Sequence, residues 1–419
     1  MSTKAPAPKR LAFIDSLRGL AVVFMVPLHA SHGWVRPAAR HGDFWNASQF
    51  FGGLAAPIFL TLTGVSLGLQ WANAQSRGRT PRFAHDCARG FRLIVLGYLL
   101  RLQMWVIDGG GYASPRAYLG QALLLSAYAL AYYAVGLLPT RPRPSIAWLA
   151  AASLLFAIGL HQVALVVPER AHNLLRVDVL QCIGASLIGL SAIARARGSH
   201  FADKRFYLIA ALIVAALTSS IRERLPGAIP EAIAAYLGQW QAEPGRAVIG
   251  LFPLFPWFAY ALEGAALGLF WGRAESEERV DTSAVALCAL GAFIALISSE
   301  SWTPVYRLLR DHVWLIQPLR VVYRMGLVLC LVGIALAARP RFVSESLPPL
   351  TVLGRASLLV YWVHLEFAFG AASAPISRRL GMREWALGSL FLLCAMWLLA
   401  YVRVVRPRLP FRARDAATG

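Results

Sequence analysis

Residues 11–30 read LAFIDSLRGLAVVFMVPLHA, an almost continuous apolar run that Asp15, Arg18 and His29 interrupt. Because a bilayer core of about 30 Å needs roughly 20 apolar residues in an α-helix, this run predicts a membrane span. Asp15 and Arg18 break the apolar region that a signal peptide would require, and no clear small-residue cleavage site follows. We therefore expect a retained first helix whose ionisable groups each have a partner or a function.

The composition of the whole chain also indicates a membrane protein. Of its 419 residues, 58% are hydrophobic and 15% are charged, whereas soluble proteins contain about 25% charged residues. So large an apolar fraction cannot be buried within water-soluble cores, and the same numbers exclude disordered chains and disulfide-rich scaffolds. We predict an all-α fold, a polytopic membrane bundle of about 10–12 transmembrane helices.

The predicted spans form a single transmembrane domain at 11–403, because apolar runs follow one another over this whole range. Residues 1–10 are expected as a cytoplasmic tail before it, and residues 404–419 as a basic cytoplasmic tail after it. The runs that we interpret as spans lie near 11–30, 50–71, 89–107, 118–138, 147–167, 177–194, 206–221, 250–271, 282–299, 318–338, 350–371 and 384–403.

The formal net charge of +20 comes almost entirely from arginine. In so apolar a chain, this charge favours loops that set the membrane orientation and contact anionic lipid over a nucleic-acid-binding surface. Most arginines fall in the tails and in the loops on one side, while the other side has longer loops, such as 31–49. We expect a multi-pass protein of the cell inner (plasma) membrane with both termini in the cytoplasm.

Charged side chains at the predicted cytoplasmic ends of two helices form a candidate anion site. Asp15 and Arg18 lie three residues apart on one helix face, as do Arg89 and Arg92. One interpretation is structural, with an ion pair that anchors the helix end and arginines that follow the positive-inside rule. The other is functional, with guanidinium groups that bind phosphates through bidentate hydrogen bonds. The chain has no P-loop, which excludes the soluble nucleotide-binding folds.

Histidines gather at the opposite end of the first helix. His29 lies eleven residues after Arg18, about 16 Å along the helix at 1.5 Å per residue, and His32 and His41 follow. No third ligand with suitable spacing is nearby, so we expect no metal. A histidine at a helix end is usually only solvated. Here, however, the imidazole would stand where a membrane cavity meets the outside, and it would suit proton transfer near neutral pH.

Four further polar residues lie in or beside later spans. Asp178 and Gln181 begin the sixth span, Glu263 lies within the eighth, and His364 lies in the eleventh. Each residue alone fits a buried hydrogen bond between helices. Together they favour a water-accessible interior, which a purely structural bundle would not need.

The opening at 10–22, RLAFIDSLRGLAV, with His29 after it, resembles the opening of polytopic membrane acyltransferases. Two groups share it: the acyltransferase-3 family of sugar O-acylases, and the heparan-alpha-glucosaminide N-acetyltransferase-like family with its YeiB-type relatives. Most of the chain is similar to the second group. The later stretches that favour this group, or fit it, are 52–66, 176–184, 252–264 and 354–364.

The resemblance implies transfer of an acyl group, acetyl or longer, from cytoplasmic acyl-CoA to an amine or hydroxyl of a sugar or glycan on the far side. In the heparan enzyme the key histidine lies in the outer loop, and His41 occupies the corresponding place here. His29 stands where the family has an asparagine, and this departure leaves both histidines as candidates. A second departure is the extra region 118–167, so the family's contacts around 176–184 are not carried over closely.

The resemblance also assigns a role to each candidate residue. Neutral His41 or His29 would deprotonate the acceptor or carry the acyl group itself. The residues assigned to the CoA phosphates at the inner mouth are Arg18, Arg89 and Arg92, with Asp15 beside them.

The remaining polar residues are assigned to the acceptor and to the transition state. Asp178 would orient a histidine or bind sugar hydroxyls, and Gln181 would donate to the tetrahedral oxyanion. Glu263 and His364 are assigned to substrate binding. Two other functions compete with this one: a transporter of an anionic or sugar substrate, and a non-catalytic membrane scaffold. The sequence leaves a homo-oligomeric state open.

Overall fold

A computed structural model of the chain describes most of its residues. The tail at 1–10 and the residues from 406 onward, on which two predictions fall, lie outside the described residues. The described ranges are 12–107, 114–136, 146–166, 174–224, 229–238, 250–272, 277–299, 313–338 and 348–405.

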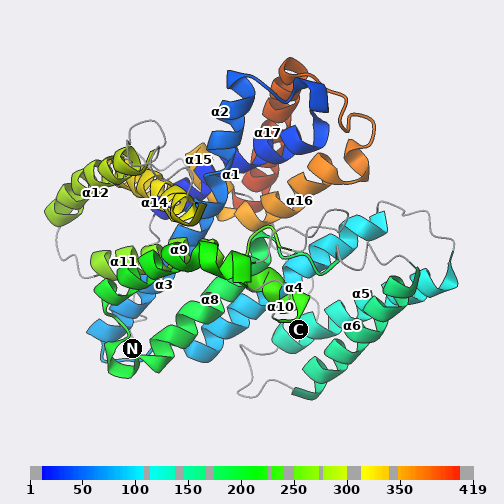
Figure 1. The fold of residues 1–419 in the computed structure, drawn as a ribbon, viewed down its shortest axis with the longest axis horizontal. Coiled ribbons are helices and arrows are strands. Elements are labelled where there is room, and N and C mark those ends of the chain that lie inside the picture. The colour runs from blue at the N-terminus through cyan, green and yellow to red at the C-terminus, as the bar shows by residue number, and fades with distance from the viewer. Residues whose placement is uncertain are drawn as a thin grey trace, which may run out of the picture. The chain divides into compact units, whose positions relative to one another are not determined.

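The chain forms two compact units. Unit 1 combines Met1–Ala55 with Leu331–Gly419, and unit 2 is Ala56–Cys330. We describe each unit by itself, and the single domain expected at 11–403 stays a prediction. In Figure 1 the blue α1 (Ala12–Trp34) lies beside the orange-red α16 (Ser357–Phe369) and α17 (Met382–Val405) within unit 1, and α1 also contacts α15 (Pro349–Arg355).

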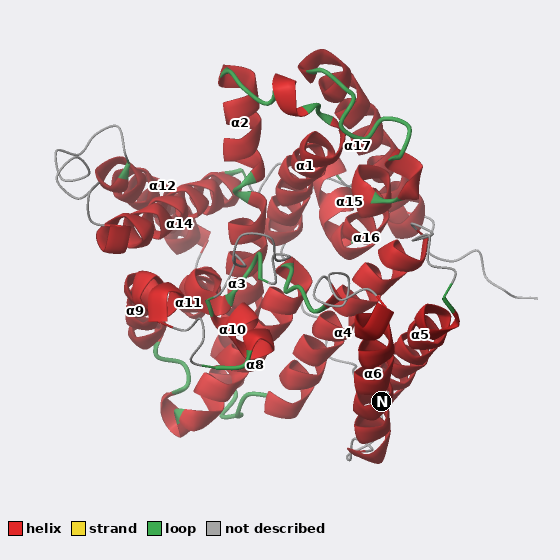
Figure 2. Cartoon of the chain, turned by 45° about the vertical axis from the view of Figure 1, so that its right-hand side comes forward, coloured by secondary structure: helices red, strands yellow, loops and turns green. Residues whose placement is uncertain are grey.

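Helices are the only regular elements of the described ranges, apart from isolated bridges and turns, and Figure 2 shows no strand there. Unit 1 contains α1 (Ala12–Trp34), α2 (Asp43–Gly52), α15 (Pro349–Arg355), α16 (Ser357–Phe369) and α17 (Met382–Val405). Unit 2 contains α3 (Ala55–Ser76), α4 (Phe83–Ile107), α5 (Pro115–Gly136), α6 (Ile146–Val166), α8 (Val179–Ala196), α9 (Lys204–Arg224), α10 (Glu231–Leu237), α11 (Leu254–Trp271), α12 (Glu277–Ser298) and most of α14 (Val313–Ala337).

The prediction of an all-α polytopic bundle is confirmed. Within the described ranges, eight helices are long and apolar enough to cross a membrane, or nine if the bent pair α15–α16 counts as one span. This is fewer than the 10–12 expected from the sequence. Helices α4, α5 and α12 do occupy ranges predicted as spans, but they do not meet the same requirement over their described residues.

Glycines bring helix backbones into contact in unit 1. A Cβ at Gly19 of α1 would strike the backbone carbonyl of Leu350, and a Cβ at Gly354 of α15 would strike that of Asp15. Such small residues let membrane helices approach closely, where packing and hydrogen bonds replace the hydrophobic effect. Beside this contact the hydroxyls of Ser16 and Thr351 lie 2.8 Å apart. The start of α1 is thus fixed against α15.

The span predicted near 350–371 is not one straight helix. The two helices α15 and α16 meet at an angle of 86°. Ala356 between them has φ −106° and ψ 15°, outside the α-helical region. Because α15 is held flush against α1 at Gly354, the chain must turn before it continues as α16. A second difference concerns 31–49, expected as an outer loop, where helix α2 begins at Asp43.

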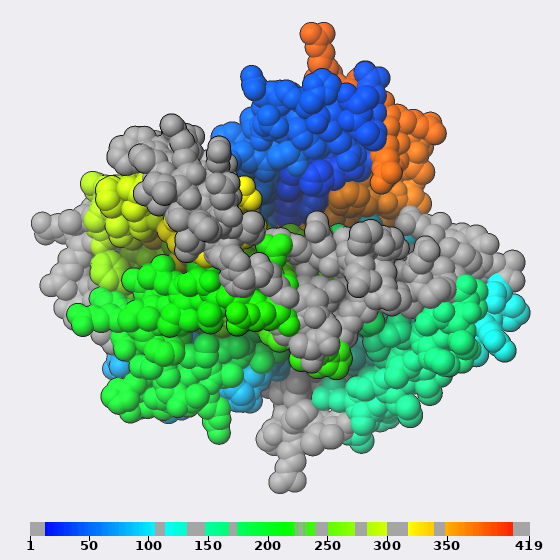
Figure 3. Space-filling view, in the orientation of Figure 1, coloured from blue at the N-terminus to red at the C-terminus, as the bar shows by residue number. Residues whose placement is uncertain are grey.

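Close helix pairs also build unit 2. The backbones of α4 and α8 approach at Gly90 and Gly184, where a Cβ on either glycine would overlap the other helix. The same holds for α5 and α6 at Gly120 and Gly159. These crossings leave apolar faces outward, and α9, on the viewed surface in Figure 3, exposes Leu208, Ile209, Leu212 and Ile213. Exposed aliphatic side chains of this kind suit contact with lipid.

Candidate functional site

The second half of α1 places His29 against His364 of α16. The Nδ1 atom of His29 and the Nε2 atom of His364 are 2.8 Å apart, although the two residues are 335 positions apart in the chain. His364 is fully buried, and its Nδ1 lies 2.8 Å from the carbonyl oxygen of Val360. His29 is half-buried. Two residues that the sequence assigned to the site therefore share one hydrogen bond.

Indole groups fix the helices around the histidine pair. The Nε1–H of Trp34 donates to the carbonyl of Phe367 at 2.9 Å, which joins α1 to α16. The Nε1–H of Trp385 on α17 donates to the carbonyl of Pro27 at 3.0 Å. A Cβ at Gly33 would strike the carbonyl of Ala368, so the two backbones are in contact there. The pair thus lies in a well-fixed part of unit 1.

The other two histidines of the cluster have different surroundings. The Nε2 atom of His32 lies 2.7 Å from Oε1 of Gln49 on α2, and the amide of Gln49 donates to Ser31. His41 is exposed, and within the described ranges no hydrogen bond, ion pair or ring contact is recorded for it. The geometry therefore favours His29 as the imidazole held for chemistry. The role of His41 stays a prediction.

A buried carboxylate lies between two guanidinium groups at the other end of α1. Asp15 is 2% exposed, and its Oδ1 lies 3.4 Å from Nη1 of Arg18. Its Oδ2 lies 3.3 Å from Nε of Arg355, the last residue of α15. Both arginines remain about one quarter exposed. This group, which we call the Asp15 cluster, carries a net charge of +1.

A second mixed-charge group begins helix α8 in unit 2. Asp178, the residue before α8, forms ion pairs with Arg101 of α4 and, at 3.5 Å, with Nε of Arg176. Its backbone N–H donates to Oε1 of Gln181 at 3.2 Å, which caps the helix. Asp178 is therefore engaged by two guanidinium groups, and its described contacts do not include a histidine.

Gln181 has an unused donor. Its side chain is fully buried, and within the described ranges its Nε2 has no hydrogen-bond partner. It packs against Gly97, where a Cβ would overlap the amide group. On the next residue of α4, the hydroxyl of Tyr98 lies 2.7 Å from that of Tyr236. Burial raises the pKa of Tyr236, so its hydroxyl stays protonated.

Glu263 and the arginine pair of α4 complete the predicted residues in unit 2. Glu263 is 5% exposed, and its Oε2 has no hydrogen-bond partner within the described ranges. Arg89 and Arg92 are half-buried, and no ion pair or hydrogen bond is recorded for either among the described residues. Arg18 belongs to unit 1, so its grouping with these two arginines stays a prediction.

The comparison with known families decides the identity of the chain. The model of the family described as heparan-alpha-glucosaminide N-acetyltransferase, catalytic, matches residues 10–306. This is more than half of the 419 residues. The chain belongs to this acetyltransferase family. The resemblance inferred from the sequence is thereby confirmed. None of the curated proteins compared with the chain matches it.

The matched range divides the candidate residues of this acetyltransferase. It contains His29, His41 and the Asp178–Gln181 motif, but it ends before α15 and α16. Arg355 and His364, which contact Asp15 and His29, therefore lie outside it. The residues of unit 1 that contact Asp15 and His29 of α1 thus come from the sequence after the family match.

The sequence analysis missed the ion pairs of three arginines with candidate residues, namely Arg355 with Asp15 and both Arg101 and Arg176 with Asp178. Arg355 stands in the 354–364 stretch that carried part of the resemblance, but nothing in its spacing indicated Asp15 as a partner. Arg101 was visible as a charge within a span, and an intramembrane charge near an intramembrane carboxylate is the signal that points to such a pair. Pairing between helices needs their relative placement, which periodicity does not provide.

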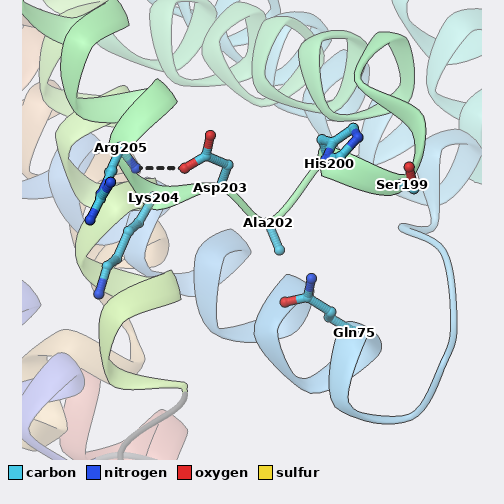
Figure 4. Close-up of a pocket in the computed structure, with 7 residues that line it drawn as sticks. All are labelled: Gln75, Ser199, His200, Ala202, Asp203, Lys204 and Arg205. Carbon is cyan, nitrogen blue, oxygen red and sulfur yellow. Dashed lines mark hydrogen bonds between the residues drawn. The ribbon is translucent and has the colours of Figure 1, made fainter.

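A pocket in unit 2 lies apart from the predicted residues of that unit. It has a volume of about 480 Å³ and is lined by Gln75 and by residues 199–205 except Phe201. Figure 4 shows Asp203 accepting a hydrogen bond from the backbone of Arg205. Asp203 is also paired with Arg197, and the Lys204 ammonium lies over the ring of Phe270. The lining contains none of the predicted site residues, so we do not assign the acetyltransferase site to this pocket.

Metal ligation finds no support in the described part of the acetyltransferase. No three His, Cys, Asp or Glu side chains there lie close enough to hold a metal ion. His29 and His364 bind each other instead, and His32 binds Gln49. The absence of a metal stays a prediction.

Proposed function

We propose that this acetyltransferase moves an acetyl group from cytoplasmic acetyl-CoA to an amine or hydroxyl of a sugar on the opposite side of the membrane. The observation that carries the proposal is the His29–His364 hydrogen bond on the membrane-spanning helix α1 of a chain in this family. Imidazole is the side chain best suited to proton transfer near neutral pH. Both family membership and the position of the ring support this activity.

The donor would bind at the cationic end of α1. The Asp15 cluster has one more guanidinium group than it has carboxylates, and its arginines reach the surface of unit 1. Guanidinium groups bind phosphates by charge-assisted, bidentate hydrogen bonds. We assign the CoA phosphates to Arg18 and Arg355 of unit 1, and a phosphate-binding role for Arg89 and Arg92 of unit 2 stays a separate prediction.

The chemistry follows from the position of His29 at the other end of the helix. His29 takes the proton from the acceptor amine or hydroxyl, whose nitrogen or oxygen then attacks the thioester carbonyl. The carbon–sulfur bond breaks, and the CoA thiolate leaves and takes the proton from His29. The products are the acetylated sugar and CoA with a free thiol. An acetyl-histidine on the same ring is the covalent variant of this step.

Gln181 is proposed to stabilise an oxyanion, and Asp178 is proposed to bind the sugar. The unused Nε2 of Gln181 in unit 2 is a donor of the kind that stabilises an oxyanion. Asp178, with its two arginines, suits sugar hydroxyls rather than a histidine. Glu263, with an unused carboxylate oxygen, remains assigned to the acceptor.

The orientation in the membrane is part of the proposal. We place the protein in the inner (plasma) membrane of the cell. Arginine-rich loops and tails on one side of the membrane favour both termini in the cytoplasm. The Asp15 cluster then lies at the cytoplasmic end of α1, where acyl-CoA is available. The histidine pair lies toward the other face.

The test uses the full chain in lipid nanodiscs with acetyl-CoA labelled in its acetyl group. Glucosamine provides an amine acceptor, and methyl glucoside provides hydroxyls only. We expect labelled acceptor and released CoA thiol in equal amounts, and loss of both with His29→Asn. Acid quenching during turnover would reveal labelled protein if an acetyl-histidine forms. Sugar flux into proteoliposomes without acetyl-CoA, combined with no labelled acceptor, would instead establish a transporter.

A further inference from the structure

His364 makes hydrogen bonds with both of its ring nitrogens, and these bonds determine where the protons are. Its Nδ1 lies 2.8 Å from the carbonyl oxygen of Val360, and a carbonyl only accepts. The proton of His364 is therefore on Nδ1. Because the ring is fully buried in a membrane helix, where an unpaired charge is costly, it is neutral. Its Nε2 is then an acceptor.

The same reasoning determines the tautomer of His29. The acceptor Nε2 of His364 faces Nδ1 of His29 at 2.8 Å, so the proton between them belongs to His29. A neutral His29 that carries its proton on Nδ1 has a lone pair on Nε2. Two successive hydrogen bonds therefore connect the Val360 carbonyl, His364 and His29. Because they leave the lone pair of His29 on Nε2, this nitrogen is the basic atom.

The ring geometry supports a strong hydrogen bond rather than a stack. The two ring planes differ by 6°, and the centroids are 5.1 Å apart. Atoms of stacked rings lie at van der Waals distance, about 3.5 Å, which is longer than the 2.8 Å between the nitrogens. The rings therefore lie edge to edge in nearly one plane, with each nitrogen directed at the other.

No neighbouring group competes for Nε2 of His29. Within the described ranges it has no recorded hydrogen-bond partner, and the ring of Phe369 lies 5.7 Å away. The titratable groups that act on His29 are His364 on α16 and His32 on its own helix, whose Nε2 is used by Gln49. Tyr361 faces His364 at 5.8 Å, with its ring edge-on. The basic atom is thus without a recorded polar partner among the described residues.

We propose that His364 is a positioning residue that holds neutral His29 with its proton on Nδ1 and leaves Nε2 to take the proton of the acceptor. This inference rests on the proposed function. When Nε2 accepts that proton, positive charge develops on His29, and its Nδ1–H bond to His364 strengthens. The charge is lost again when Nε2–H protonates the CoA thiolate. His364 itself never contacts the substrate.

The test compares two substitutions of His364 in the full chain. His364→Phe keeps a ring but removes both nitrogens, whereas His364→Gln keeps an oxygen that accepts from Nδ1–H of His29. We expect His364→Phe to lower kcat about 100-fold, as loss of an orienting partner does, with the KM values for acetyl-CoA and acceptor changed less than about threefold. His364→Gln should restore kcat to within about fivefold of the wild type.

A spectroscopic measurement tests the proton positions without reference to activity. Nitrogen-15 chemical shifts of labelled histidines distinguish the two neutral tautomers, and the His29 signals are assigned as those missing in His29→Asn. We expect a proton on Nδ1 in the wild type and in His364→Gln, and a mixture or the other tautomer in His364→Phe. A wild-type proton on Nε2 would overturn the inference.

The outcomes separate the inference from the proposed function. If the wild type transfers no acetyl group, the proposed function fails, while the chemical shifts still report the tautomer. If transfer occurs but His364→Phe retains full kcat, the positioning role is wrong. If His364→Phe does not fold, the wild-type spectrum and the kcat of His364→Gln decide. A wild-type proton on Nδ1 of His29, together with a kcat of His364→Gln near that of the wild type, supports the inference. A proton on Nε2 or a large loss of kcat in His364→Gln contradicts it.

Discussion

The two ends of α1 use polar groups in opposite ways. At its start, the Asp15 cluster is ionic, with a carboxylate shared by two guanidinium groups that remain partly exposed. At its other end, His29 and His364 share a single hydrogen bond between uncharged rings. The first arrangement leaves excess positive charge, and the second leaves one basic nitrogen. Under the proposed function, this difference would correspond to anion binding at one end of α1 and proton transfer at the other.

The largest expected effect tests the histidine end. His29→Asn removes the basic nitrogen but keeps a polar side chain at this place. We expect acetyl transfer to fall by about 10³-fold or more, within the range for loss of a general base. The measurement is the rate of labelled acceptor formation in nanodiscs.

His41→Asn is the matched control for this prediction. Because His41 is exposed and has no recorded contact within the described ranges, we expect its rate to stay within about twofold of the wild type. Equal losses in the two variants would show that the outer loop shares the catalytic role. A loss in His41→Asn alone would transfer the role to His41 and end the contrast between the ends of α1.

The second prediction concerns Gln181, a buried residue of unit 2 whose Nε2 has no hydrogen-bond partner within the described ranges. Gln181→Leu keeps the side-chain volume but removes Nε2, and we expect kcat to fall about 100-fold if that group stabilises the oxyanion. The variant also loses the cap bond to the Asp178 N–H, which costs about 1 kcal/mol of stability. Thermal melting, measured beside kcat, separates the two effects. A fall in activity that only follows the folded fraction would make Gln181 structural.

The smallest expected effect tests the ionic end. Arg355→Gln removes the excess charge of the Asp15 cluster but leaves Arg18 paired with Asp15, so the fold should persist. We expect the KM for acetyl-CoA to rise about tenfold, with kcat changed less than about twofold, because uniform binding is lost. The rise should shrink at high salt, which screens partly exposed charges.

Arg403→Gln is the control for Arg355→Gln, since it removes an exposed arginine from α17 of the same unit. An equal rise in KM for both variants would mean that net charge alone attracts acyl-CoA. Arg355 would then have no specific role in binding acyl-CoA, and the contrast between the two ends of α1 would not hold.

The all-α membrane fold could be predicted from the sequence. Apolar runs of the length of a bilayer, such as 11–30, predicted helices, and the structure has helices in those ranges. The bend at Ala356 was not predictable, because the segment around it is as apolar as a straight span. The bend depends on the contact of Gly354 with α1, which only the three-dimensional arrangement reveals.

The candidate site was predicted in its residues but not in its pairs. Charge and imidazole inside apolar runs are conspicuous, so Asp15, His29 and His364 stood out at once. Their partners did not, because a helix face that carries one polar residue does not specify which distant helix supplies the next. The roles of these residues in catalysis stay predictions.

One consequence follows from the way unit 1 combines both ends of the chain. The ribosome synthesises α1 before α16, and 335 positions separate the two imidazoles. A nascent or prematurely terminated polypeptide that stops before α16 can still insert most of its helices into the bilayer, yet it lacks His364. The histidine pair can thus assemble only after α16 has been synthesised, and a truncated product in the membrane would contain His29 without the residue proposed to orient it.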